Sequence, residues 1–200
     1  EELYEKIQKV ISSEIPFVLF RAQGPLFSSG ANIKKVYEAP DKREFFAKLS
    51  ACIYESFFAI RKSRQIFISA VHGKVIGVAL PFVLCTDLIW AQEETSFLPG
   101  YLNLGLFPNG GLTFLLPELL GNKKALELLF VKKQLSAQEA FSMGLISAVL
   151  PKASFKTDVE ERMRTLLQGP VAQYQKTKEL FAIQTNRDFE NHLRLEREAL

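Results

Sequence analysis

The stretch Phe27-Ser28-Ser29-Gly30-Ala31-Asn32-Ile33-Lys34 says more about the fold of this chain than any other. It follows a short apolar run, Phe17-Val18-Leu19-Phe20, which is typical of a buried strand. A strand that enters a turn of small residues and then a helical segment leaves backbone N–H groups free at the turn. N–H groups that point to one place can hold an oxygen that gains negative charge during a reaction. We therefore expect this turn to bind a polarised carbonyl group.

Strands and helices alternate along the rest of the chain. Further strands are expected where short apolar runs occur, at 66–71, 88–91, 96–98 and 145–150. Helices are expected where apolar residues recur at helical spacing, at 2–12, 41–62, 77–85, 109–119, 123–132 and 137–143. From residue 154 onward the pattern stays helical, with a break near Gly169-Pro170. The alternation predicts an α/β fold, with a core over residues 1–152 and a helical region over residues 153–200.

Composition narrows the classes of function. The chain has 200 residues, of which 48% are apolar and 24% charged, as in ordinary globular domains. Its net charge of +3 comes without a dense block of Lys or Arg, so we expect no nucleic-acid partner. No apolar run approaches the roughly 18 residues of a membrane span, and no signal peptide is visible, so we expect no membrane partner. Cys52 and Cys85 lack a metal-ligand spacing, which predicts free thiols, no metal site, and the cytoplasm or another reducing intracellular compartment.

Several segments together carry a family resemblance. They share the family's order and spacing, and they are Phe27–Asn32, His72–Gly77 ending at Thr86-Asp87, Leu104–Gly111, Leu135–Ala140 and Met143–Ile146. The chain resembles the enoyl-CoA hydratase/isomerase superfamily, also called the crotonase family, over nearly its whole length. By the same resemblance, we expect the family's usual first β-strands to be missing ahead of residue 1.

The resemblance implies a crotonase-like spiral of β-β-α turns with a helical C-terminal region, and assembly into homotrimers or hexamers. It implies an acyl thioester of coenzyme A as the substrate, or the same pantetheine arm on a carrier protein. Coenzyme A would then be part of the substrate, and no tightly bound cofactor is expected. By position, the thioester oxygen would lie between the backbone N–H groups of Ala31 and Val78.

The same resemblance assigns coenzyme A binding to the segment around the first turn, by way of Ser29, Gly30, Asn32, Ile33 and Lys34. Lys34 or its neighbour could meet a phosphate or the adenine, or could be an ordinary solvated lysine. Asn32 could equally cap the helix that follows.

The acids of a hydratase are missing from their expected positions. Hydration of an enoyl thioester needs two carboxylates, which by position correspond to Pro81 and Tyr101, and the isomerase glutamate corresponds to Asn109. Each missing acid or base costs roughly 10²–10⁴-fold in rate, so hydratase activity should be very weak. Tyr101 and Asn109 remain as polar candidates for the catalytic site, although Tyr101 could be a packing residue and Asn109 a loop residue or helix cap. Val78, where relatives usually have glycine, should narrow the acyl pocket.

Three other polar residues are expected to have structural roles. His72 ends a strand and is expected to be structural rather than catalytic. Asp87 should anchor backbone groups at a turn, and His192, on the last helix, should face solvent or a neighbouring subunit.

Two classes of function stay open. The first is enolate chemistry without carboxylates, such as decarboxylation, isomerisation, dehydration or another lyase reaction, with Tyr101 as a possible participant. Here the chain is similar both to family members that act on carrier-bound substrates in polyketide β-branching and to peroxisomal Δ3,Δ2-enoyl-CoA isomerases of fatty acid metabolism with their chromodomain-fused relatives. The second is an inactive binding or scaffolding subunit. An α/β-hydrolase is excluded, because no Gly-x-Ser-x-Gly elbow occurs.

Overall fold

The computed structural model describes residues 2–102 and 105–199, with the backbone alone for Ile33, Gln184, Arg187 and Ala199. Four parallel strands form the larger sheet, in the order β1 (Phe17–Phe20), β2 (Ile66–Val71), β4 (Leu88–Gln92) and β7 (Ala148–Leu150). The smaller sheet contains β3 (Lys74–Ile76), β5 (Ser96–Leu98) and β6 (Leu135–Ser136), and its β5–β6 pair is antiparallel.

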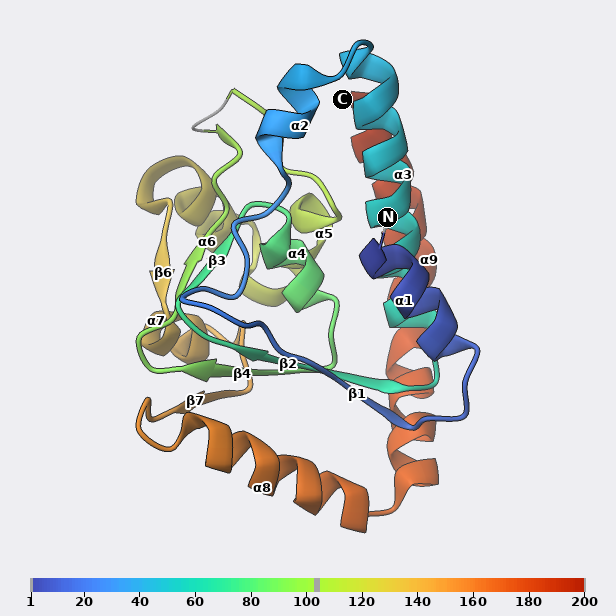
Figure 1. Ribbon diagram of the computed structural model, residues 1–200, viewed down its shortest axis with the longest axis vertical. Coiled ribbons are helices and arrows are strands. Elements are labelled where there is room, and N and C mark those ends of the chain that lie inside the picture. The colour runs from blue at the N-terminus through green and yellow to red at the C-terminus, as the bar shows by residue number, and fades with distance from the viewer. Residues whose placement is uncertain (1, 103–104, 200) are drawn as a thin grey trace.

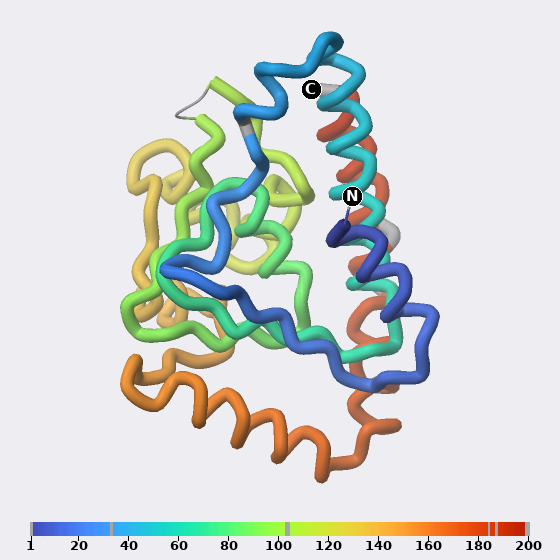
Figure 2. The backbone as a smooth tube through the Cα atoms, viewed as in Figure 1, coloured from blue at the N-terminus to red at the C-terminus, as the bar shows by residue number. Residues whose placement is uncertain are grey.

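The chain moves between the two sheets in repeated turns of two strands and a helix. From β2 it enters β3, passes through α4 (Ala79–Leu84), returns to the larger sheet as β4 and leaves again as β5. Figure 2 shows this winding path. The next turn contains four helices, which are α5 (Leu112–Leu120), α6 (Asn122–Glu127), the π-helix η2 (Leu128–Lys132) and α7 (Ala137–Ser142).

Both faces of the larger sheet are buried, which explains the continuous apolar run of β2. Successive side chains of a strand point to opposite faces. Ile66, Ile68 and Ala70 accordingly pack with Val159 of α8 (Phe155–Gln168), the helix below the sheet in Figure 1. The alternate residues of β2 face the main core around α4.

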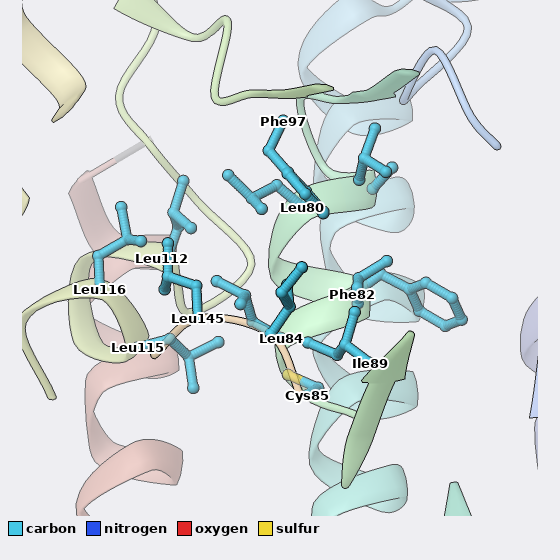
Figure 3. Packing of buried hydrophobic residues seen from close by; sticks show 14 of the residues in the cluster. Leu80, Phe82, Leu84, Cys85, Ile89, Phe97, Leu112, Leu115, Leu116 and Leu145 are labelled. Atoms are coloured by element: carbon cyan, nitrogen blue, oxygen red, sulfur yellow. The ribbon is translucent and has the colours of Figure 1, made fainter. Parts of the chain in front are cut away.

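The main core joins α4 to α5 and to α3 (Lys42–Lys62). All six residues of α4 are buried, as is typical of a central helix. Figure 3 shows Leu80 and Leu84 of α4 in one layer with Leu112 and Leu115 of α5. This packing fixes α4 and α5, whose first turns adjoin the pocket described below.

Three helices lie outside this layer, namely α1 (Glu2–Ile11), α2 (Ile33–Glu38) and the long α9 (Val171–Ala199). Figure 1 shows α9 running beside α3. Lys178 of α9 donates hydrogen bonds to the carbonyls of Ile60 and Gln65, at 3.0 and 2.8 Å, and pairs with Asp87 at 2.8 Å. The start of α9 is therefore tied to the end of α3. No helix in the described residues is long and apolar enough to cross a membrane.

The structure confirms each predicted strand and helix in outline, and it corrects several bounds. The strand expected at 145–150 begins at Ala148, because the preceding residues form a turn after α7. The helix expected at 109–119 begins at Leu112, because Gly110 and Gly111 have φ values of 73° and 82°, outside the helical region. The helix expected at 123–132 becomes a π-helix at Leu128, and β3 was not predicted as a strand.

The side-chain expectations had mixed outcomes. Asp87 does anchor backbone, since its carboxylate accepts a 2.7 Å hydrogen bond from the Phe67 N–H, and both cysteines are free. His72 has a contact of 2.9 Å with the Gly24 carbonyl. The expectation for His192 was wrong: its Nε2 lies 2.6 Å from Thr113 Oγ1 of the same chain, because α9 packs directly against α5.

Candidate active site

The turn around Gly30 is held against β3 as if it were an additional strand. Ser28 pairs with Val75 in parallel register, and its N–H donates to the Lys74 carbonyl at 3.1 Å. The Ile76 N–H donates in return to the Ser28 carbonyl at 3.0 Å. These ladder bonds bring the turn that follows Ser28 next to the turn that follows β3.

The two turns touch at Gly30, whose φ is +89°. A Cβ at Gly30 would lie 2.8 Å from the Ile76 carbonyl oxygen and 3.5 Å from the Val78 nitrogen. The first of these distances is too short for any side chain, so the approach of the two backbones requires glycine. Gly30 thus allows the neighbouring residue, Ala31, to sit beside the start of α4.

Two backbone N–H groups in these turns have no internal partner. The neighbouring amides are used: Gly30 donates to Ser28 Oγ at 3.1 Å and Gly77 to the Leu98 carbonyl at 2.9 Å. Across the described residues, no acceptor is bonded to the N–H of Ala31 or of Val78. Val78 is the N-cap of α4, where a free N–H adds to the positive end of the helix dipole.

Both turns border a pocket of about 100 Å³. Its wall is mostly apolar and comes from both turns, from α3 and from the segment after β5; its residues are Ser29, Gly30, Ala31, Phe46, Leu49, Ser50, Ile53, Ile76, Gly77, Val78, Gly100, Tyr101, Leu106 and Asn109. No Asp or Glu is among them in the described part of the chain. The same part contains no group of three or more His, Cys, Asp or Glu arranged to hold a metal.

The chain as a whole has counterparts among known proteins. Residues 1–200 match the family model described as enoyl-CoA hydratase/isomerase. The chain belongs to this family. YhaR of Bacillus subtilis (strain 168), whose name refers to the same family, is 31% identical over 202 aligned residues, which cover 99% of this chain and 77% of YhaR.

Solved structures agree on the fold of this enoyl-CoA hydratase/isomerase family member. An enoyl-CoA hydratase from Mycobacterium avium subsp. paratuberculosis K-10 superposes with a TM-score of 0.89 at 25% identity, over 98% of this chain and 78% of that one. A Thermobifida fusca YX protein solved with acetoacetyl-CoA gives a TM-score of 0.79 at 24% identity, over 98% of this chain and 84% of that one. The fold is therefore the crotonase fold, with its helical C-terminal region.

Two polar side chains of the pocket stand where family hydratases and isomerases were expected to have acids. Tyr101 is 7% exposed, and its hydroxyl donates to the Asn109 carbonyl at 3.4 Å. Burial, and then the nearby Glu196 carboxylate, raise the pKa of Tyr101 well above its ordinary value. Tyr101 is therefore a neutral hydrogen-bond donor near pH 7 and not a base. The Oδ1 atom of Asn109 is buried and has no hydrogen-bond partner.

The other predicted site residues fall into two groups. Ser29, Gly30, Ala31 and Val78 line the pocket together with the two polar residues just described. Asn32 and Lys34 lie outside it: Asn32 caps α2 by accepting from the Lys35 N–H at 3.3 Å, and Lys34 is an exposed partner of Glu38 at 3.7 Å. The side chain of Ile33 is outside the described residues.

Pro81 does not line the pocket, although it occupies an expected acid position. It packs behind the turn at Gly110, where a Cβ would lie 3.0 Å from Pro81 Cγ. This position therefore contributes neither an acid nor any other group to the described pocket wall.

Sequence reasoning missed the contribution of α3 to the pocket. Phe46, Leu49 and Ile53 belong to the helix expected at 41–62, which was not connected with a binding site, yet they line the pocket. Ser50, which is 4% exposed, interrupts this apolar side with a hydroxyl and also lines the pocket. A polar residue within an apolar helical stripe was the available signal.

Proposed function

We propose that this enoyl-CoA hydratase/isomerase family member binds an acyl thioester of coenzyme A, with the thioester oxygen between the N–H groups of Ala31 and Val78. The observation that carries the proposal is that both amides lack partners where two adjacent turns meet the pocket. Amides already in place for an oxygen that gains charge stabilise an enolate without reorganising. The fold-mate solved with acetoacetyl-CoA supports the choice of ligand.

The acyl group is short. The pocket of about 100 Å³ is smaller than the roughly 150 Å³ cavity that accepts benzene in a designed core variant. It therefore holds an acyl part of a few heavy atoms, such as acetyl or malonyl. The Val78 side chain, which belongs to the wall, contributes to this limit.

The chemistry is enolate formation that needs no carboxylate base. In a decarboxylation the C–C bond breaks, carbon dioxide leaves, and the electron pair passes into an enolate whose oxygen accepts both amide bonds; the α-carbon then takes a proton. No acid lines the described pocket, and the raised pKa of Tyr101 excludes a phenolate base near pH 7. Tyr101 can still donate a hydrogen bond, so isomerisation or dehydration through a neutral donor is the next choice.

The binding test compares ligands that differ only at the carbonyl. Acetyl-CoA and its thioether analogue S-ethyl-CoA are titrated calorimetrically, with free coenzyme A as a third ligand. We expect acetyl-CoA to bind about tenfold more tightly than the thioether, the equivalent of about 1.4 kcal/mol for hydrogen bonds to the oxygen. Equal affinities would refute the assignment of the amides.

A protein variant tests one amide by itself. Val78 has φ −61°, the value that proline imposes, so Val78→Pro removes the N–H while keeping this backbone angle. Val78→Ala retains the N–H and shortens the side chain, which makes it the matched control. Val78→Pro should abolish the preference for the thioester, and Val78→Ala should preserve it. Because the comparison is between two ligands on one variant, a general loss of stability does not imitate the result.

A second candidate is a binding or scaffolding subunit that retains the pocket without turnover. The absence of any acid from the described wall favours it. Malonyl-CoA, crotonyl-CoA and a 3-enoyl-CoA, incubated with the chain and followed by mass spectrometry, decide between the two. If the chain binds thioesters specifically but converts none of the three compounds, the result favours a binding or scaffolding subunit.

The proposal includes partners beyond the acyl group. Lys34 and Lys35 are exposed next to the pocket turn and are our candidates for a phosphate of coenzyme A, whereas a carrier-protein substrate would not need them.

Three apolar side chains of α9 are exposed, and they are Leu180, Phe181 and Ile183, at 55%, 77% and 66%. Their exposure supports a homotrimer or hexamer that covers them. Analytical ultracentrifugation tests the assembly, and affinities for coenzyme A against pantetheine thioesters test the lysines.

A further inference from the structure

The carboxylate of Glu196, near the end of α9, is buried against the beginning of α5. Glu196 is 8% exposed. Its Oε2 accepts a 2.7 Å hydrogen bond from the Gly111 N–H, and its Oε1 accepts one of 3.1 Å from the Thr113 N–H. The Thr113 hydroxyl is also bonded to Oε1. A single side chain thus binds three donors at one helix end, across 83 residues of sequence in the last two cases.

The number of hydrogens on each group shows that His192 also takes part in these hydrogen bonds. Thr113 Oγ1 has one hydrogen, and an ionised carboxylate can only accept, so the hydroxyl donates to Glu196. His192 Nε2, 2.6 Å from the same oxygen, must then donate its own hydrogen to Thr113. Two residues of α9 therefore hold Thr113, and both act on the first turn of α5.

This end of α5 continues directly from the pocket wall. The turn 109–111 begins with Asn109, which lines the pocket and accepts the hydroxyl of Tyr101. At the other end of the turn, a Cβ on Gly111 would lie 2.3 Å from Phe189 of α9. The turn is thus fixed between the pocket on one side and α9 on the other.

We infer that Glu196 is a positioning residue that fixes the turn 109–111 and so places Asn109 and Tyr101 in the pocket wall. The inference rests on the proposed function. It assigns a role at the site to a helix that contributes no residue to the described pocket wall. Neither polar residue touches Glu196 through a hydrogen bond, so its effect passes through the turn.

Burial of the Glu196 carboxylate and the hydrogen bonds it accepts act on stability in opposite directions, which allows its positioning role to be separated from general stabilisation. Burial raises the pKa of Glu196, while the bonds from Thr113 and Gly111 lower it, and burial is the larger influence. An isosteric glutamine removes the cost of burying the charge together with part of the bonding, so Glu196→Gln should change overall stability little. It should nevertheless loosen the turn, because an amide group has only one acceptor oxygen for the three donors.

Hydrogen exchange measures the turn without any ligand. In Glu196→Gln we expect the amides of Gly111 and Thr113 to exchange at least tenfold faster, with the amides of β2 unchanged. The matched control is Glu198→Gln on the same helix, an exposed partner of Arg194, in which all rates should stay as in the parent chain. Should Glu196→Gln lower Tm by more than about 5 °C, Thr113→Val, which removes the hydroxyl and keeps the N–H, replaces it.

Ligand preference measures the consequence for the site. The ratio of Kd for free coenzyme A to Kd for acetyl-CoA should fall about fivefold in Glu196→Gln and remain constant in Glu198→Gln. A loss of affinity for both ligands by the same factor, or unchanged exchange at Gly111 and Thr113, would overturn the inference. If the parent chain does not prefer acetyl-CoA, the proposed function fails, and the exchange rates by themselves decide whether Glu196 holds the turn.

Discussion

Two of the polar contacts between α9 and the rest of the chain involve a carboxylate, and these two contacts are built differently. Near its start, Lys178 pairs with Asp87 and also binds two backbone carbonyls. Near its end, Glu196 has no cation within salt-bridge distance in the described residues and binds backbone amides and a hydroxyl instead. The first contact involves no residue of the described pocket wall, and the second holds a turn of that wall. We expect the first to govern stability and the second to govern ligand preference.

The largest effect should come from breaking the ion pair. Lys178→Met leaves Asp87 and two carbonyls without their donor, while the side chains of Lys178 and Asp87 are only 9% and 24% exposed. Removing one partner of such a pair should lower the free energy of unfolding by about 3 kcal/mol. Urea unfolding at pH 7 measures it.

The matched control for this variant is Lys176→Met, two residues earlier on α9. Its exposed pair with Glu179 should be worth less than about 0.5 kcal/mol. A cost for Lys178→Met no greater than that of its control would show that the pair is not a stabilising contact.

A smaller loss should follow from crowding α9 at the other contact. Gly111→Ala places a methyl group 2.3 Å from a ring atom of Phe189, at a backbone φ of +82°. Strain and overpacking together should cost about 2 kcal/mol in free energy of unfolding.

Gly144→Ala is the reference for Gly111→Ala. Its φ is +80°, and nothing lies within 4 Å of the added carbon, so only backbone strain of about 1 kcal/mol should remain. If the two variants unfold at the same urea concentration, Phe189 yields easily and α9 does not pack tightly on the turn.

The direction in which the free energy of unfolding changes with pH should identify the contribution of Glu196. Burial raises the pKa of this carboxyl above 4.5, so the folded chain still holds the proton at a pH where the unfolded chain has lost it. Stability must therefore fall as pH rises from about 4.5 to the pKa of the folded state, and level off above it. In Glu196→Gln this decrease should disappear.

The difference in unfolding free energy between the parent chain and Glu196→Gln, measured by urea at a series of pH values, isolates this one group. Both proteins contain the titratable groups that interact with the Glu196 carboxylate, which are His192, Tyr54 and Tyr101. Their own contributions therefore largely cancel in the difference. A difference that increases with pH would mean that the amide bonds outweigh burial.

The smallest expected quantity is the coupling between the two contacts. They are 18 residues apart on one helix, or about 27 Å at about 1.5 Å per residue. A double-mutant cycle of Lys178→Met and Glu196→Gln should give an interaction within about 0.5 kcal/mol of zero. A coupling above about 1 kcal/mol would mean that α9 docks as one cooperative unit, and the division of roles would not hold.

Local signals predicted the elements of this fold well and their junctions less well. Apolar runs located the strands of the larger sheet, because both faces of that sheet are buried. The helix expected at 137–143 is α7, and its start follows from a local signal, the capping box of Ser136 and Glu139. The start of α5 was misplaced because Gly110 and Gly111 resemble a helix entry in sequence but adopt left-handed backbone angles.

The residues of the candidate site also differ in how well the sequence predicted them. Ser29, Gly30 and Ala31 were found because small residues at a turn have a local signature, whereas Val78 was assigned by position from the family resemblance. Ser50 and Glu196 were missed as pocket-related residues because their roles depend on which helices pack together. Glu196 lies on an amphipathic helix, where one more polar side chain gives no local sign of being buried, whereas Ser50 did interrupt the apolar stripe of α3.

The pairing of Ser28 with Val75 has a consequence for how a ligand is received. Since ordinary sheet hydrogen bonds hold the two turns together, the positions of the two free amides are determined when the chain folds and not when a thioester arrives. Association then orders little protein backbone, which limits the entropy lost on binding. After a ligand dissociates, the two amides keep the same positions, so the next ligand meets an unchanged site.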